Sequence, residues 1–129
     1  MKVLVTGGAG FIGSHLVERL VQLNHTVVVL DNLLRGNKLP KEVQDKIDMH
    51  VGDVRDADLV SRCMQGVDLV YHFAAVLGVD VVADHPVETM DVEVIGTRNI
   101  IQSAHQHKVK QVFYASTSGI YSHSAIVKT

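Results

Sequence analysis

Three glycines near the N-terminus stand at a spacing that suits phosphate binding. Gly7, Gly10 and Gly13 form the pattern Gly-x-x-Gly-x-x-Gly. In this pattern the first glycine permits a tight turn, the second lets the backbone approach a phosphate, and the third lets a helix pack closely against the preceding strand. The free N–H groups at the start of that helix, including those of Phe11 and Ile12, would face an anion. The pattern therefore predicts a pyrophosphate site.

An acidic residue follows the glycines at roughly the 20-residue interval expected of a dinucleotide-binding unit. Asp31 ends the apolar run of residues 26–30. A carboxylate at this strand tip is placed to accept hydrogen bonds from both ribose hydroxyls of an adenosine. It would repel a 2′-phosphate, so NAD is favoured over NADP, although the nearby Arg35 softens that preference. A glycine-rich turn without a ligand, beside a solvated Asp31, is the alternative.

Alternating apolar and amphipathic segments indicate how these residues are positioned. Short apolar runs predict five strands, and segments with helical periodicity lie between them. The predicted strands are residues 2–5, 26–30, 47–51, 67–73 and 110–115, and the predicted helices are residues 11–23, 41–45, 56–64 and 86–107. This alternation predicts an α/β fold, a Rossmann-like, doubly wound parallel sheet of order 3-2-1-4-5. The strand tips then bring Asp31, Asp53, Ala74, Ala75, Ser116 and Thr117 to one edge of the sheet.

The helical patterns also predict which faces are buried. In the first helix, Ile12, Leu16 and Leu20 share the face expected to pack on the sheet. The long helix that begins at Pro86 has two apolar faces, which predicts two packing partners. One face is expected to hold Met90, Val94, Ile101 and Ala104, and the other Val92 and Ile95. The segment before His85 is predicted to be a loop.

Size and composition limit the class of protein. The chain has 129 residues, a length that suits one domain. Its net charge is −2 and its pI is near 6.4, so a nucleic-acid partner is not expected. No apolar run reaches the roughly 20 residues of a membrane span, and no signal peptide precedes the first strand, so we expect a cytoplasmic protein. The single cysteine, Cys63, is expected in the core. His105 and His107 do not have metal-ligand spacing, so no metal is expected.

Several motifs together resemble the extended short-chain dehydrogenase/reductase family, specifically its nucleotide-sugar epimerase and dehydratase branch. They extend over nearly the whole chain, so the resemblance does not depend on the glycines alone. The matching segments are Thr6–Gly13, Asp31-Asn32, Gly52–Asp56, His72–Ala75, Pro86 with Gly96-Thr97, and Tyr114–Tyr121.

The resemblance implies NAD as cofactor and assigns contacts to it. Asp31 and Asn32 match the ribose-binding pair, and Asp53 with Val54 matches the segment that flanks the adenine. The loop that starts at Phe73 matches the one that passes the nicotinamide ribose and the pyrophosphate. The implied cofactor-binding residues are Gly7, Gly10, Phe11, Ile12, Gly13, Asp31, Asn32, Asp53, Val54, Phe73, Ala74 and Ala75.

The chemistry that the resemblance implies is transient transfer of a hydride from a nucleotide sugar to NAD. Thr117 matches the family's catalytic hydroxyl, which hydrogen-bonds the reacting oxygen; the alternative is a hydroxyl that satisfies the turn backbone. The family's Tyr-x-x-x-Lys pair is not found in these residues. We therefore expect residues 1–129 to be an incomplete NAD-binding Rossmann domain, truncated after the fifth strand, without useful turnover alone.

Three further expectations concern departures, partners and alternatives. Glu93 stands where the family usually has asparagine, so either its side chain turns outward or cofactor affinity is reduced. The Pro86 helix matches a family dimer interface, and the fifth strand is an open edge, so self-association is expected. A non-catalytic dinucleotide-binding sensor or scaffold module and a steroid-dehydrogenase-like oxidoreductase remain alternative functions.

Overall fold

Strands and helices alternate along the chain, as the sequence predicts. The structure, a computed structural model, describes residues 1–75 and 79–116. The strands are β1 (Lys2–Thr6), β2 (Thr26–Asp31), β3 (Asp48–Val51), β4 (Leu69–His72) and β5 (Gln111–Tyr114). The helices are α1 (Phe11–Gln22), α2 (Lys41–Gln44), α3 (Ala57–Cys63), α4 (Val79–Asp84), α5 (Pro86–Asp91), the π-helical η1 (Val92–Gly96) and α6 (Thr97–Gln106).

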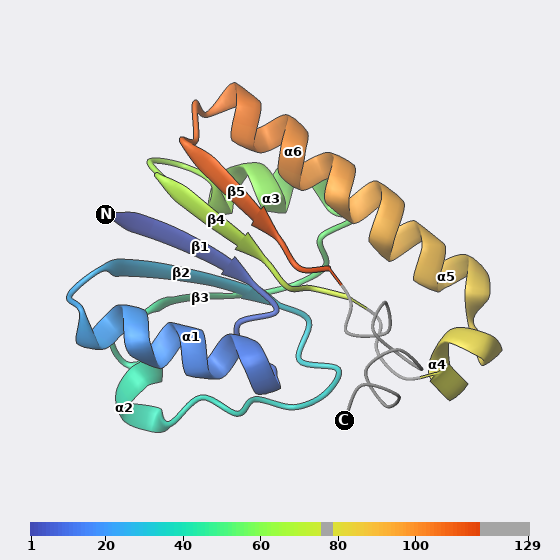
Figure 1. Ribbon diagram of the computed structural model, residues 1–129, viewed down its shortest axis with the longest axis horizontal. Coiled ribbons are helices and arrows are strands. Elements are labelled where there is room, and N and C mark those ends of the chain that lie inside the picture. The colour runs from blue at the N-terminus through green and yellow to red at the C-terminus, as the bar shows by residue number, and fades with distance from the viewer. Residues whose placement is uncertain (76–78, 117–129) are drawn as a thin grey trace, which may run out of the picture.

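The strands form one parallel sheet in the order β3-β2-β1-β4-β5, which confirms the predicted Rossmann-like topology (Figure 1). In the central strand, Thr6 is in register with Leu30 of β2 and with His72 of β4. The order reverses between β1 and β4, so the segments that follow these strands diverge and leave a crevice at their carboxyl ends. β3 is an edge strand, as predicted.

Helices cover both faces of the sheet, and alternate residues of β1 and β2 pack against them (Figure 1). On one face, Val5 and Val29 form a core with Val17 of α1. On the other face, Leu4 and Val28 pack in a core with residues of α3 and α6. Each fully buried aliphatic side chain of this kind contributes about 1.5–3 kcal/mol. The second core includes Val60, Cys63, Met64, Val70, Ile100 and Ala104.

The position of Cys63 confirms the expectation of a buried, non-disulfide cysteine. Burial raises the pKa of its thiol to about 11, so the thiolate is scarce at neutral pH. In the part of the chain that the structure describes, no helix is both long enough and apolar enough to cross a bilayer.

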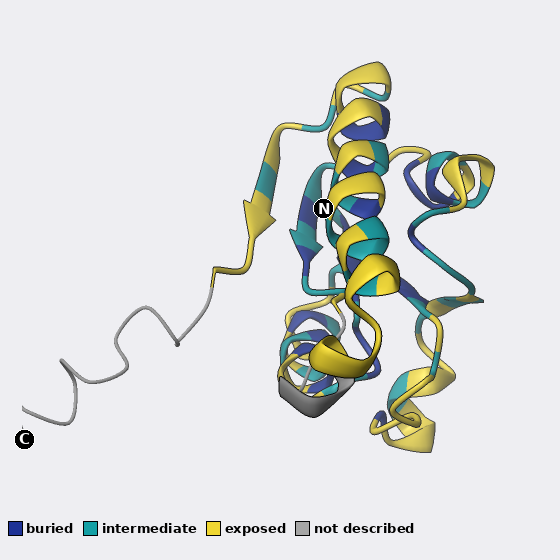
Figure 2. Ribbon diagram, turned by 90° about the vertical axis from the view of Figure 1, so that its right-hand side faces the viewer, coloured by how far each residue is buried: buried dark blue, intermediate teal, exposed yellow. Residues whose placement is uncertain are grey.

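The long segment from Pro86 to Gln106 is helical throughout, with a π-helical stretch at its centre. Ile100 and Ala104 face the core, whereas Met90 and Val94 are 66% and 62% exposed. Figure 2 shows exposed residues along much of this helix and buried residues on one side. The prediction that Ala104 shares a face with Met90, Val94 and Ile101 is therefore wrong. Ile101 is also exposed, at 51%, although it lies in α6 together with the buried Ala104, so the side of the helix that meets the core is not the one that the apolar pattern indicates.

Two other local predictions are also wrong. Ile12 is 68% exposed and does not lie on the buried face of α1, because the first turn of this helix borders the crevice. Part of the segment before His85, predicted to be a loop, forms the short helix α4.

Candidate functional site

Every residue to which the resemblance assigns a cofactor contact lines a single cavity at the carboxyl edge of the sheet. This cavity has a volume of about 1030 Å³ and also borders Arg55, Glu88, Thr89 and Val92. The lining residues come from segments that follow β1, β2, β3 and β4 and from the start of the long helix. Parallel strands bring these segments together although they are far apart in the sequence. Thr117, the predicted catalytic residue, lies outside the described residues.

The glycine turn has the conformation that the sequence predicts. Gly7 has φ +71°, and its N–H donates to the Leu30 carbonyl oxygen at 2.8 Å. A Cβ on Gly7 would also lie 2.8 Å from the Phe73 carbonyl carbon, so glycine is required twice over. Gly13 packs on the backbone of this turn, mainly Gly7 and Gly8, more than on the strand itself.

The N-terminus of α1 is suited to an anion. Gly10 is its N-cap and provides no side-chain acceptor, and the first turn has no acidic residue. The first N–H groups of a helix have no partner within the helix, and its dipole is positive at this end. Gly10, Phe11 and Ile12 all line the cavity, so the start of α1 can hold a phosphate there.

The Asp31 carboxylate lies beside the glycine turn and connects the end of β2 to it. Its Oδ2 accepts a hydrogen bond from the Ala9 N–H at 3.0 Å, and its Oδ1 accepts one from the Leu33 N–H at 2.8 Å. Each oxygen retains capacity for another donor. The neighbouring Asn32 uses its Oδ1 to accept from the Leu34 N–H at 3.0 Å. This arrangement leaves the Asp31 carboxylate fixed in place and able to accept hydroxyl hydrogens from a ligand.

A charged pair lies where the adenine end of the cavity is predicted. Arg55 donates from Nε to both carboxylate oxygens of Asp53, at 3.1 and 3.0 Å, and from Nη2 to Oδ2. These hydrogen bonds hold the pKa of Asp53 below its usual value, and burial opposes them only in part. Arg55 Nη2 also lies 3.8 Å from Glu88 Oε1 on α5. The loop after β3 is thereby connected to the long helix across the cavity.

Val54 is held by the long helix through contacts that explain part of the Gly96-Thr97 motif. The Asn99 side-chain amide donates to the Val54 carbonyl oxygen at 3.0 Å. A Cβ on Gly96 would lie 2.5 Å from Val54 Cγ2, so only glycine allows η1 to approach this closely. The backbone of the predicted adenine-binding segment is therefore positioned by α6 and η1.

A polar cluster lies between the strands β1 and β4 and the start of α6. His72 Nδ1 is 2.6 Å from Thr6 Oγ1, and His72 Nε2 is 3.4 Å from Thr97 Oγ1. His72 is 3% exposed, as expected for a residue packed at a strand end. Burial lowers the pKa of His72 to about 4, so the imidazole is neutral at physiological pH.

The lowered pKa of His72 predicts that folding stability falls in mild acid. The unfolded chain has an ordinary histidine pKa and binds more protons than the folded chain between about pH 6.5 and about pH 4. The contribution of His72 to the free energy of unfolding is complete above about pH 6.5 and is lost as the pH falls toward 4. Urea unfolding at about pH 7 and about pH 5 should differ by on the order of 2 kcal/mol from this residue. A His72→Asn variant should show a smaller pH dependence, and an unchanged slope would contradict the assignment.

Glu93, the departure from the family pattern, has a polar partner on the sheet. Its Oε2 accepts a hydrogen bond from the Tyr114 hydroxyl at 3.1 Å. The negative charge of Glu93 raises the pKa of Tyr114. Glu93 is not among the residues that line the cavity. Its effect on cofactor affinity stays a prediction.

Sequence reasoning did not identify several residues that hold the cavity walls. The roles of Arg55, Glu88, Asn99 and Thr97 arise from contacts between segments that are distant in sequence. Two other residues could have been found from the sequence. His72 directly precedes the Phe73-Ala74-Ala75 loop and Thr6 directly precedes Gly7, so both are adjacent to segments predicted to bind the cofactor.

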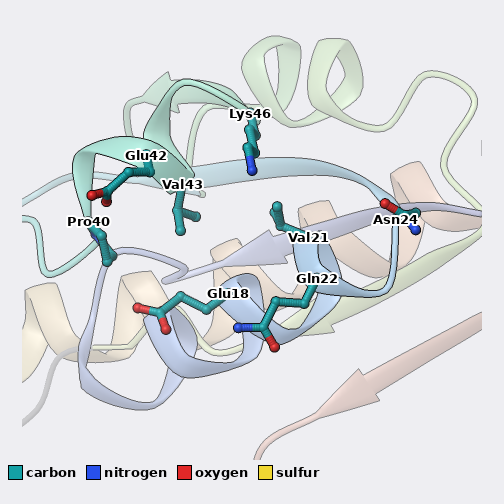
Figure 3. Close-up of a pocket in the computed structure, with 8 residues that line it drawn as sticks. All are labelled: Glu18, Val21, Gln22, Asn24, Pro40, Glu42, Val43 and Lys46. Atoms are coloured by element: carbon teal, nitrogen blue, oxygen red, sulfur yellow. The ribbon is translucent and has the colours of Figure 1, made fainter.

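A second, smaller hollow lies between α1 and α2 (Figure 3). Its volume is about 360 Å³, and it shares no lining residue with the large cavity. Figure 3 shows Glu18 and Gln22 on one side and Glu42 and Lys46 on the other. Within residues 1–75 and 79–116, no group of three or more metal-ligating side chains is found.

The sheet order, the glycine turn and the cavity at the switch point define a Rossmann-type nucleotide-binding domain. The family model for the NAD-dependent epimerase/dehydratase family matches residues 3–128. The chain belongs to this family, which confirms the predicted resemblance and, at the level of the family, NAD as the cofactor.

Similar proteins support the same family. A putative UDP-glucose 4-epimerase of Methanocaldococcus jannaschii is 39% identical over 118 residues, which are 91% of this chain and 38% of that protein. A dTDP-glucose 4,6-dehydratase of Mycobacterium tuberculosis is 38% identical over 94% of this chain and 38% of its own. The crystal structure of Thermus thermophilus UDP-glucose 4-epimerase in complex with NAD superposes with a TM-score of 0.81, at 39% identity over 91% of this chain and 38% of that one. This chain therefore spans less than two fifths of these relatives.

Proposed function

We propose that residues 1–129 are the NAD-binding portion of a nucleotide-sugar epimerase or dehydratase. The observation that carries this proposal is the Asp31 carboxylate, which accepts from the Ala9 N–H of the glycine turn at the edge of the cavity. The cavity residues fit a dinucleotide: an uncapped helix start for the diphosphate, Asp31 for the adenosine ribose, and Asp53 with Val54 for the adenine. When bound, NAD supplies a hydride acceptor.

Calorimetric titration of the chain with NAD and with NADP tests the proposal. We expect saturable NAD binding and weaker NADP binding, because a 2′-phosphate would meet the charge of Asp31. ADP-ribose, which lacks the nicotinamide, should retain most of the affinity. An absence of NAD binding would contradict the cofactor assignment and with it the proposed function.

Sugar chemistry belongs to the complete protein under this proposal. Thr117 is proposed to donate its hydroxyl hydrogen to the reacting sugar oxygen, and a Tyr-x-x-x-Lys pair is required beyond these residues. General acid–base help is typically worth roughly 10²–10⁴-fold in rate. We therefore expect no useful turnover of a nucleotide sugar by residues 1–129 with added NAD. Measurable epimerase or dehydratase turnover by this chain would refute that expectation. A sensor or scaffold role would instead be favoured if the complete protein bound NAD without turnover.

Self-association through the long helix is part of the proposal. The exposed apolar residues of its outer surface include Val87, Met90, Val94 and Ile101. Association would remove this apolar surface from water, and a buried charge would oppose it. Light scattering at high concentration should therefore detect dimers or larger species for the wild-type chain and monomers for Val94→Glu. Gln65→Glu adds the same charge at an exposed site outside the long helix and is the control. A monomeric wild-type chain at high concentration would contradict the proposal.

A cytoplasmic location remains a prediction.

A further inference from the structure

The polar cluster of Thr6, His72 and Thr97 is buried beside the cavity, and none of its side chains is assigned a cofactor contact. Thr6 is completely buried, and His72 is nearly so. The three residues come from β1, β4 and the first turn of α6. Polar groups buried at this depth are costly unless they are hydrogen-bonded, so their hydrogen bonds can be accounted for one by one.

The hydrogen bonds of the Thr6 hydroxyl determine the form of His72. Thr6 Oγ1 accepts from the Phe73 N–H and from the Ala74 N–H, both at 3.1 Å, and the Phe73 N–H is shared with the Thr6 carbonyl oxygen at 3.0 Å. A hydroxyl has two acceptor positions and one hydrogen to donate. With both positions taken, its hydrogen donates to His72 Nδ1 at 2.6 Å. Nδ1 is then the acceptor nitrogen, so the neutral ring holds its proton on Nε2, which faces Thr97 Oγ1 at 3.4 Å.

The two amides that Thr6 holds belong to a wall of the cavity. Phe73, Ala74 and Ala75 line the cavity, and so does Gly7 of the glycine turn. The two segments touch: a Cβ on Gly7 would lie 2.9 Å from the Ala74 nitrogen. The main-chain hydrogen bond from the Phe73 N–H to the Thr6 carbonyl oxygen also joins these segments, and the Thr6 hydroxyl adds a second connection whose orientation depends on His72.

We propose that His72 is a positioning residue for the dinucleotide, whose neutral ring orients the Thr6 hydroxyl and thereby fixes the Phe73-Ala74 wall against the glycine turn. This inference rests on the proposed function, because the wall matters only if a cofactor occupies the cavity. His72 is not among the residues that line the cavity, so its side chain acts on the wall through Thr6.

The groups around His72 are consistent with a neutral ring. β1 contributes Thr6, and α6 contributes Thr97, neither of which is charged. β5 contributes the Tyr114 ring, 5.8 Å from the imidazole between centroids, and the Tyr114 hydroxyl donates to Glu93 of η1. The Glu93 carboxylate therefore accepts its hydrogen bond from Tyr114. Burial is what lowers the pKa of His72.

A matched pair of Thr6 variants tests the proposal by NAD titration. Thr6→Val keeps the shape of the side chain but removes the hydroxyl, whereas Thr6→Ser keeps the hydroxyl. We expect Thr6→Val to weaken NAD binding about tenfold, because the Ala74 N–H loses its acceptor while the Phe73 N–H keeps only the Thr6 carbonyl oxygen, and Thr6→Ser to stay within about threefold of the wild-type chain. At His72, Asn presents an oxygen that can accept the Thr6 hydroxyl hydrogen and Phe does not. His72→Asn should therefore bind NAD about tenfold more tightly than His72→Phe.

Nitrogen NMR of the histidine rings provides a readout that a merely structural role would not predict. The wild-type chain should show His72 as the neutral Nε2–H form down to about pH 5. Thr6→Val should shift the Nδ1 resonance, because that nitrogen loses its hydrogen bond. If Thr6→Val fails to fold, as judged by thermal unfolding, the His72 pair and the wild-type spectrum decide the question.

The outcomes separate this inference from the proposed function. A wild-type chain that does not bind NAD overturns the proposed function. A wild-type chain that binds NAD, with equal affinity in Thr6→Val and Thr6→Ser, overturns the positioning role alone. A His72 ring protonated on Nδ1 also overturns it.

Discussion

A Gly13→Ala substitution is expected to lower the free energy of unfolding by about 4 kcal/mol or more, while Gly10→Ala should leave the fold intact. On helix propensity alone, alanine inside α1 should stabilise by roughly 1 kcal/mol. The sign reverses because a Cβ on Gly13 would overlap the Gly7 carbonyl oxygen, and this neighbour is backbone that cannot turn away. Overlap with the main chain moves the whole turn, which displaces α1 from the sheet.

Gly10→Ala should separate binding from folding. Its added Cβ meets only the Gly7 carbonyl oxygen, at 3.3 Å, and the backbone of Gly10, φ −79° and ψ −173°, suits any residue. The methyl group would instead occupy the cavity where a diphosphate approaches the start of α1, so NAD affinity should fall at least about tenfold.

Chemical denaturation of both variants, with NAD titration of Gly10→Ala, measures these effects. Gly66→Ala shows the cost of backbone strain without overlap, because Gly66 has φ +71° and its Cβ would meet only ordinary contacts with Lys2, whereas Gly13 has overlap without a positive φ. It should cost about 1–2 kcal/mol. A Gly13→Ala variant as stable as the wild-type chain would contradict the packing of α1 on the turn.

Removing the carboxylate of Asp31 should abolish most of the affinity for NAD. The Asp31→Ala variant loses charge-assisted hydrogen bonds to the ribose, each worth about 1.5–3 kcal/mol, so the Kd should rise about a hundredfold. The preference for NAD over NADP should also shrink, because the group that repels a 2′-phosphate is gone. The variant should lose stability too, since the N–H groups of Ala9 and Leu33 lose their acceptor.

Asp31→Asn distinguishes charge from hydrogen bonding at the same position. Its amide keeps one acceptor oxygen, so it should be more stable than Asp31→Ala and bind NAD with an intermediate affinity. Asp45→Asn removes the same charge from an exposed site that does not line the cavity, and should bind like the wild-type chain. Equal NAD affinity in Asp31→Ala and the wild-type chain would contradict the proposed cofactor site.

Local pattern predicted most of the architecture. The apolar runs and the helical periods indicated the strands and the order 3-2-1-4-5 because each element buries a face that its own sequence defines. The same reasoning assigned Ile12 to the buried face of α1 and was wrong there, since periodicity cannot tell where a helix extends past the edge of a sheet. It also assigned Ala104 to the same face as Met90, Val94 and Ile101, because an apolar pattern does not show which side of a helix meets the sheet.

The sequence by itself determined the topology of the sheet, the glycine turn, the position of Asp31 at a strand tip and the family of the chain. Those features depend on spacing along the chain, which the order of residues specifies directly. Only the tertiary structure decided that Arg55 spans from Asp53 toward Glu88, that Gly96 packs on Val54, and that Thr6 meets His72 and the Phe73-Ala74 amides. These contacts join segments far apart in sequence, and their geometry follows from how the helices pack on the two faces of the sheet.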